Sequence, residues 1–154
     1  MNDTIIRNHN SIVTNVDTVI HVGDFSLISN RKRVLSIVDQ LNGIHIFLRG
    51  SHDYWIPVKN SIQLLEIVYR DIFIVACHYC MLRWPRSHYN SWYVFGHNHG
   101  SITVDYKAHD VGVDNNDFYP VSINQLITIM SNKIDNPDYE MLQKEKMERS
   151  YLSM

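Results

Sequence analysis

The sequence has few cysteines and no long hydrophobic run. Cys77 and Cys80 are its only cysteines, too few and too close together for a disulfide framework, which favours a reducing compartment. No apolar stretch approaches the roughly 20 residues that span a bilayer. The first residues also lack the charged-then-apolar order of a signal peptide. These absences argue against membrane insertion and predict a cytoplasmic protein.

A large excess of charge of one sign is absent too. The formal net charge is -2, which gives no indication of a nucleic-acid-binding or membrane-surface protein. With 45% hydrophobic and 19% charged residues, the chain has the composition of a folded domain, and 154 residues suffice for one core. Nine histidines are many for this length and raise the expectation of metal chemistry.

The spacing of apolar residues predicts a layered α/β fold. The order strand, helix, strand over residues 18–48 is a βαβ unit, which implies two parallel strands. We expect a domain over residues 1–134 and a charged, helical tail over 135–154. The first predicted helix follows a cap at Asn2 or Asp3 and runs to residue 13, and the others cover 31–41, 123–130 (capped by Ser122) and 138–149. The predicted strands cover 18–22, 44–48, 64–69, 72–76, 92–95, 102–105 and 111–113.

Polar clusters follow four of these strands directly. The carboxyl ends of strands in α/β sheets are where binding sites assemble. A carboxylate and several imidazoles there suit Mn, Fe, Zn or Ni better than Ca or Mg. Each cluster alone has a simpler explanation, such as a turn aspartate or a hydrogen-bonded core histidine. The clusters are Gly23-Asp24, Gly50-Ser51-His52-Asp53, Cys77-His78-Tyr79 and Gly96-His97-Asn98-His99.

The order of these clusters resembles that of the calcineurin-like metallophosphoesterases, in a small bacterial and phage branch, over about residues 3–127. The blocks of that family are Asp-x-His, Gly-Asp, Gly-Asn-His-Asp, a lone His and Gly-His-x-His. All but the first have a counterpart here. The resemblance implies a metallophosphoesterase-type sandwich with a central mixed sheet. Because no Asp-x-His precedes the first predicted helix, we expect that sandwich to lack its first strand.

The resemblance also implies a set of metal ligands. Asp24 would bridge two metals, His78 and His97 would bind the second metal, and His99 would bind the first. Ser51 stands where the family has a metal-binding asparagine, and a serine hydroxyl is a poorer ligand. The first site is left with two ligands and the second with three, the number typical of a catalytic zinc site. We therefore expect one divalent metal rather than two.

Catalytic and substrate-binding residues are implied by the same resemblance. His52 would lie over the substrate phosphate as a general acid or electrostatic stabiliser, and Asp53 would orient it. Arg83 and His88 lie between two of the clusters and are candidates for binding an anionic substrate, although a solvated basic loop explains them nearly as well. Cys77 and Cys80 resemble half of a structural zinc site, but the sequence has no second pair.

Two functions are consistent with these residues. The first is a metal-dependent phosphoesterase that hydrolyses a phosphomonoester or phosphodiester of a small molecule or nucleotide. The second is a catalytically weak or inactive relative that binds a protein or a nucleotide. The pair His52-Asp53 favours the enzyme, whereas Ser51 and the absent Asp-x-His favour the binding module. The missing strand would leave a gap in the sheet, so self-association or a protein partner is expected to cover it.

Overall fold

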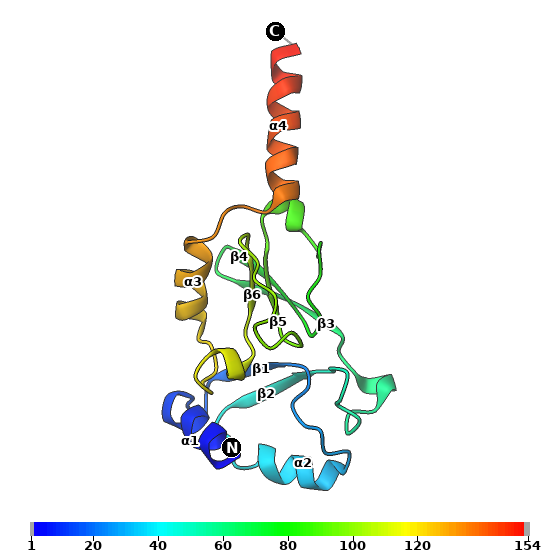
Figure 1. The fold of residues 1–154 in the computed structure, drawn as a ribbon, viewed down its shortest axis with the longest axis vertical. Coiled ribbons are helices and arrows are strands. Elements are labelled where there is room, and N and C mark those ends of the chain that lie inside the picture. Colours follow the sequence, from blue (N-terminus) through cyan, green and yellow to red (C-terminus); the bar gives the residue numbers. More distant parts are fainter. Residues whose placement is uncertain (1, 153–154) are drawn as a thin grey trace.

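A parallel βαβ unit forms one half of the molecule in the computed structural model, which describes residues 2–152 (Figure 1). Helix α1 (Asn2–Ile12) precedes strand β1 (Thr18–Val22), helix α2 (Arg31–Val38) and strand β2 (Ile44–Leu48). The two strands pair in parallel, as predicted, with Thr18 opposite Ile44. Asn30 caps α2 by accepting a hydrogen bond from the Arg33 amide. Helices α1 and α2 lie on one side of this strand pair (Figure 1).

A mixed sheet of four strands forms the other half. It contains β3 (Leu64–Tyr69), β4 (Ile72–Cys77), β5 (Trp92–Phe95) and β6 (Ala108–Asp110), in that order across the sheet. β3 and β4 form an antiparallel hairpin, whereas β4, β5 and β6 are parallel. Because β4 and β5 run in the same direction, the chain leaves both strands at the same edge of the sheet.

The main hydrophobic core lies between the two halves. It includes Leu48 from β2, Ala76 from β4 and Val94 from β5, packed against Leu126 and Met130 of helix α3 (Ile123–Ser131). Helix α3 begins at Ser122, as predicted, where Ser122 and Gln125 form a capping box. This shared core holds the carboxyl ends of strands from both halves in one region.

Helix α4 (Pro137–Leu152) projects from the rest of the chain (Figure 1). It is attached at its base, where Asp138 accepts a hydrogen bond from Ser87 in the short helix η2 (Ser87–Tyr89). Asn136 donates to the Ser87 and Ser91 carbonyls just before the helix. The division into residues 1–134 and 135–154 stays a prediction, and residues 1, 153 and 154 lie outside the described part. Within that part, no helix is long and apolar enough to cross a membrane.

Three predicted elements differ in the structure. Residues 102–105, predicted to be a strand, form an irregular segment. The last strand is β6 rather than residues 111–113, because the chain joins the sheet where Ala108 pairs with Tyr93. Helix α2 ends at Val38, three residues earlier than predicted, with Asp39 as its C-cap. The mixed sheet excludes β1 and β2, which form their own two-stranded sheet. Within residues 2–152, the strand that pairs with β1 is β2. That a second copy or a partner protein covers the other edge of β1 stays a prediction.

The core between the halves generates a first prediction. Met130 is fully buried in it, and we expect Met130→Ala to lower the free energy of unfolding by about 2–5 kcal/mol through lost burial and a cavity. Met147 on α4 is 58% exposed, so Met147→Ala is the matched control and should have almost no effect. Urea unfolding of both variants measures the difference. Equal losses would show that α3 does not pack as described.

Candidate metal centre

Two glycines let the chain segments of the candidate site approach closely. A Cβ atom on Gly23, which follows β1 at a φ of +82°, would lie 2.5 Å from Nδ1 of His78. A Cβ atom on Gly50, which follows β2, would lie 2.2 Å from Oδ1 of Asp24. Both contacts are closer than carbon atoms tolerate. The two loops and the His78 ring therefore share a space that only glycine leaves open.

Asp53 fixes these loops relative to each other. Its buried carboxylate accepts hydrogen bonds from the amides of Asp24 (2.6 Å), Gly50 (2.9 Å) and Ser26 (3.3 Å) and from the indole N–H of Trp55 (2.9 Å). Both carboxylate oxygens are used. In the structure, Asp53 thus joins the turn after β1 to the turn after β2, instead of orienting the His52 ring as the sequence predicts.

His78 at the end of β4 is held in one orientation. Its ring is 1% exposed, and Nδ1 lies 3.0 Å from the carbonyl oxygen of Val22. A carbonyl only accepts, so the Nδ1 position carries the proton, and the lone pair of the neutral ring is on Nε2. Nε2 points at Oδ2 of Asp24, 3.2 Å away, and lies 3.1 Å from Nδ1 of His97.

Asp24, His78 and His97 form what we call the triad. Each offers one ligand atom, and the three atoms lie within 4.8 Å of one another. When His78 is neutral, two of the three atoms, the carboxylate oxygen of Asp24 and Nε2 of His78, carry lone pairs and no proton. Facing acceptors repel unless a proton or a cation lies between them. One carboxylate and two imidazoles are a donor set that suits Zn, Mn, Fe or Ni, so the residues present fit a divalent metal.

The surroundings of Asp24 keep it ionised. Partial burial raises its pKa, but hydrogen bonds from the His52 amide (2.7 Å) and the Ser51 hydroxyl (2.9 Å), together with the charge on His78 when protonated, lower the pKa below its ordinary value. Asp24 and His97 both have positive φ, at 53° and 68°. Such backbone strain is concentrated at functional sites and turns.

The structure separates the other predicted ligands from the triad. Ser51 donates its hydroxyl hydrogen to Asp24, so it contacts a ligand rather than acting as one. The His99 ring is 78% exposed and bonds Asp114, and this bond raises the pKa of His99. The pairing with Asp114 draws His99 to a carboxylate outside the triad.

The predicted substrate-binding residues lie in different places. The amide of His52 bonds Asp24, and its exposed ring lies on the same loop. His88 lies in η2, before β5, whereas His97 of the triad follows the opposite end of β5, a strand roughly 13 Å long at 3.3 Å per residue. Arg83 is exposed in the loop between β4 and η2. The geometry therefore brings His52 to the triad, but not His88.

Tyr79 is a neighbour of the triad that the sequence reading missed. Its ring packs edge-on against the imidazoles of His78 and His97, with centroid distances of 4.8 and 4.9 Å, and is 44% exposed. The only signal in the sequence was its position directly after His78. Contacts on both rings limit how far His97, the exposed member of the triad, can rotate.

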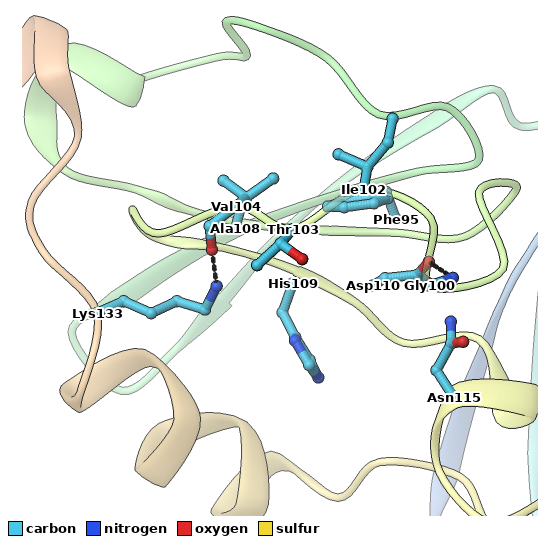
Figure 2. Close-up of a pocket in the computed structure, with 10 residues that line it drawn as sticks. All are labelled: Phe95, Gly100, Ile102, Thr103, Val104, Ala108, His109, Asp110, Asn115 and Lys133. Carbon is cyan, nitrogen blue, oxygen red and sulfur yellow. Dashed lines mark hydrogen bonds between the residues drawn. The ribbon is translucent and has the colours of Figure 1, made fainter.

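A separate hollow of about 200 Å³ is lined in part by Phe95 and Gly100 (Figure 2), the residues on either side of 96–99. His109 and Asn115 line it, and Lys133 donates to the Val104 carbonyl there. Burial, then the charge of Lys133, lowers the pKa of His109. None of the residues that line this hollow belongs to the triad. The candidate metal centre is therefore outside it.

Comparison with known proteins supports the fold and leaves the activity open. No family model matches the sequence. The uncharacterized protein MJ1445 of Methanocaldococcus jannaschii is 28% identical over 142 residues, covering 84% of this chain and 75% of that protein. The crystal structure of a protein of unknown function, AQ665 from Aquifex aeolicus, matches with a TM-score of 0.63 at 21% identity, covering 83% of this chain and 84% of that one. The chain shares a mixed α/β fold with that structure.

The role of Asp53 generates a second prediction. Asp53→Ala leaves four donors without an acceptor, three of them backbone amides, and we expect a loss of at least about 3 kcal/mol in the free energy of unfolding. Asp71 is exposed in the β3–β4 turn, and Asp71→Ala is the control. Urea unfolding measures both variants. A loss below about 1 kcal/mol for Asp53→Ala would mean that these hydrogen bonds do not hold the two loops together.

Proposed function

We propose that this protein is a metal-dependent phosphoesterase of the calcineurin-like type that works with one divalent metal. The observation that carries the proposal is the orientation of His78. Its Nδ1 proton is committed to the Val22 carbonyl, so its Nε2 lone pair meets the Asp24 carboxylate and the His97 ring. The resemblance in the order of the four clusters supplies the reaction class.

Asp24, His78 and His97 would hold the metal in this proposal. When bound, a divalent metal polarises a phosphoryl oxygen as a Lewis acid and neutralises charge in the transition state. The hydrogen bond between His78 and the Val22 carbonyl keeps the ring in its ligating tautomer, as hydrogen bonds to the other nitrogen of a ligating histidine do in known metal sites. The pairing of His99 with Asp114 supports one metal rather than two.

His52 is the residue that we propose to contact substrate. Its amide is fixed on Asp24 of the triad, while its side chain is exposed to solvent. A neutral or protonated imidazole in this position can stabilise a phosphoryl oxygen or donate a proton to the leaving group. Asp53 contributes by holding the Gly50 amide and the Trp55 indole on either side of His52, which makes it a positioning residue.

One observation favours the alternative of a binding module with weak or no activity. Within residues 2–152, no hydrogen bond from another residue orients the ring of His52, since Asp53 is occupied elsewhere. An unrestrained imidazole is a less efficient catalyst than an oriented one. In this alternative, the metal would hold the phosphate of a nucleotide or a small molecule without cleaving it.

Metal binding is the third prediction. Zn²⁺ or Mn²⁺ should bind the purified protein with one metal per chain, and His97→Ala should weaken that binding by about 100-fold or more, because even outer-shell changes cost 10–100-fold. His99→Ala is the matched control, two residues along the same turn, and should leave the affinity unchanged. Isothermal titration measures all three proteins. Two metals per chain, or equal losses in both variants, would contradict the one-metal assignment.

Hydrolysis of an aryl phosphodiester in the presence of Mn²⁺ is the fourth prediction. His52→Ala should lower kcat by about 100-fold or more while metal affinity is retained, because general acid catalysis contributes factors of this size. His88→Ala, at the opposite end of β5, should have wild-type kcat and KM. Metal binding without any turnover by the wild-type protein would instead support the binding module.

A further inference from the structure

A second group of histidines lies away from the triad, on the other face of β1 and β2. His9 of α1, His21 of β1 and His45 of β2 form what we call the histidine cluster. The ring centroids of His21 and His45 are 5.1 Å apart, and those of His9 and His45 are 5.7 Å apart. Helix α1 covers this part of the strand pair (Figure 1), and His9 is 5% exposed.

The hydrogen bonds of the histidine cluster each pair one N–H donor with one acceptor. Nε2 of His9 bonds the Asn42 carbonyl at 2.8 Å, and Nε2 of His45 faces the Leu41 carbonyl at 3.4 Å. Carbonyls only accept, so both Nε2 atoms carry protons. Nδ1 of His45 is then an acceptor, and it receives the proton of His21 Nε2 at 3.0 Å. An added proton on Nδ1 of His45 would face this same N–H as long as His21 keeps its proton on Nε2.

The aromatic rings around His21 carry no negative charge that would stabilise a positive one. Its ring stacks on Phe47 at 4.4 Å and contacts the edge of Phe25 at 4.8 Å. Burial, then the neighbouring rings of His45 and His9, lowers the pKa of His21 to about 3, and burial first also lowers the pKa of His45. The charged side chains of the elements that pack here are exposed: Asp3 and Arg7 on α1, Arg31, Lys32 and Arg33 on α2, and Asp17 and Asp39 in the adjoining turns.

We propose that the histidine cluster is an acid-sensitive latch, which holds α1 on β1 and β2 while it is neutral and releases α1 when it is protonated. The remaining contacts of α1 are those of a helix that can detach. Asn10 exchanges hydrogen bonds with the Gln40 carbonyl and the Asn42 amide, and Asn8 bonds the carbonyls of Asp117 and Phe118. These bonds join side chains to loops, and water can replace them.

The direction of the pH effect follows from the depressed pKa values. Above pH 6.5, the ordinary pKa of a histidine, His21 and His45 are neutral both when α1 is docked and when it is released. As the pH falls below that value, the released state takes up protons that the docked state excludes. Each such histidine weakens docking by up to about tenfold per pH unit. Asp17 and Asp24 also have lowered pKa values, but aspartates take up protons only near and below pH 3.8, their ordinary pKa. They therefore contribute little to a change that begins below pH 6.5.

Release of α1 would affect the candidate metal centre through two chain segments that contact α1 and lead to the site. His21 is three residues before Asp24 on the same strand and turn. The loop at Asp117 and Phe118, which Asn8 holds, follows Asp114, the partner of His99. Acidification would thus loosen the segments on both sides of the triad. The latch itself does not depend on the proposed hydrolysis.

Amide hydrogen exchange, corrected for the intrinsic effect of pH, tests the proposal directly. The protein is measured with a chelator present from pH 7.5 to 4.5, so that loss of metal does not contribute. We expect the protection of α1 amides to fall by at least about tenfold per pH unit below pH 6, while α3 amides keep their protection. Nitrogen NMR of the rings should show the His21 tautomer protonated at Nε2 throughout.

Two variants separate the latch from general acid unfolding. His21→Phe places an aromatic ring between Phe25 and Phe47 and should reduce the pH dependence of α1 protection. His45→Asn, which keeps an acceptor for His21, should do the same and replaces the first variant if that one does not fold. His88→Gln, an exposed histidine on η2, is the control and should behave as wild type. Parallel loss of α1 and α3 protection, or an unchanged pH dependence in both cluster variants, would overturn the proposal.

Discussion

The hydrogen bond from His78 to the Val22 carbonyl is the contact on which the candidate metal centre depends. It joins the last residue of β1 to the residue that follows β4, and Gly23 leaves the space that the ring needs. The carbonyl of His78 also accepts the Gly96 amide, which brings the end of β5 to the same point. One buried residue thus joins three strand ends, through its side chain and its carbonyl, and directs Nε2 at Asp24 and His97.

The two groups of histidines show how the same side chain is used for opposite purposes. In the triad, the committed proton of His78 leaves lone pairs facing each other, an arrangement that a cation satisfies. In the histidine cluster, each close contact of a ring nitrogen with another polar atom pairs an N–H donor with an acceptor. These hydrogen bonds need no cation, and an added proton would disrupt them. The direction of the local hydrogen bonds, rather than the number of histidines, distinguishes the triad from the histidine cluster.

Much of this arrangement could be predicted from the sequence, because local signals control it. The bounds of β1, β2, β3 and β5 follow from apolar runs that end at glycine or turn residues, and Ser122 marks the start of α3. The convergence of Asp24, His78 and His97 followed from their places after strands. The start of β6 and the partners of Asp53 and His99 depend on contacts between distant segments, which no local pattern encodes. Tyr79 and the histidine cluster were missed for the same reason.

The central claim is that Asp24, His78 and His97 hold one divalent metal. A crystal grown with Zn²⁺, measured on both sides of the zinc absorption edge, tests this most directly. The account predicts a single anomalous peak about 2.0–2.2 Å from Nε2 of His78 and from a carboxylate oxygen of Asp24. Nδ1 of His78 should remain bonded to Val22. A peak bound by His99 and Asp114 alone, or an empty triad in which His78 donates a proton to Asp24, would contradict it.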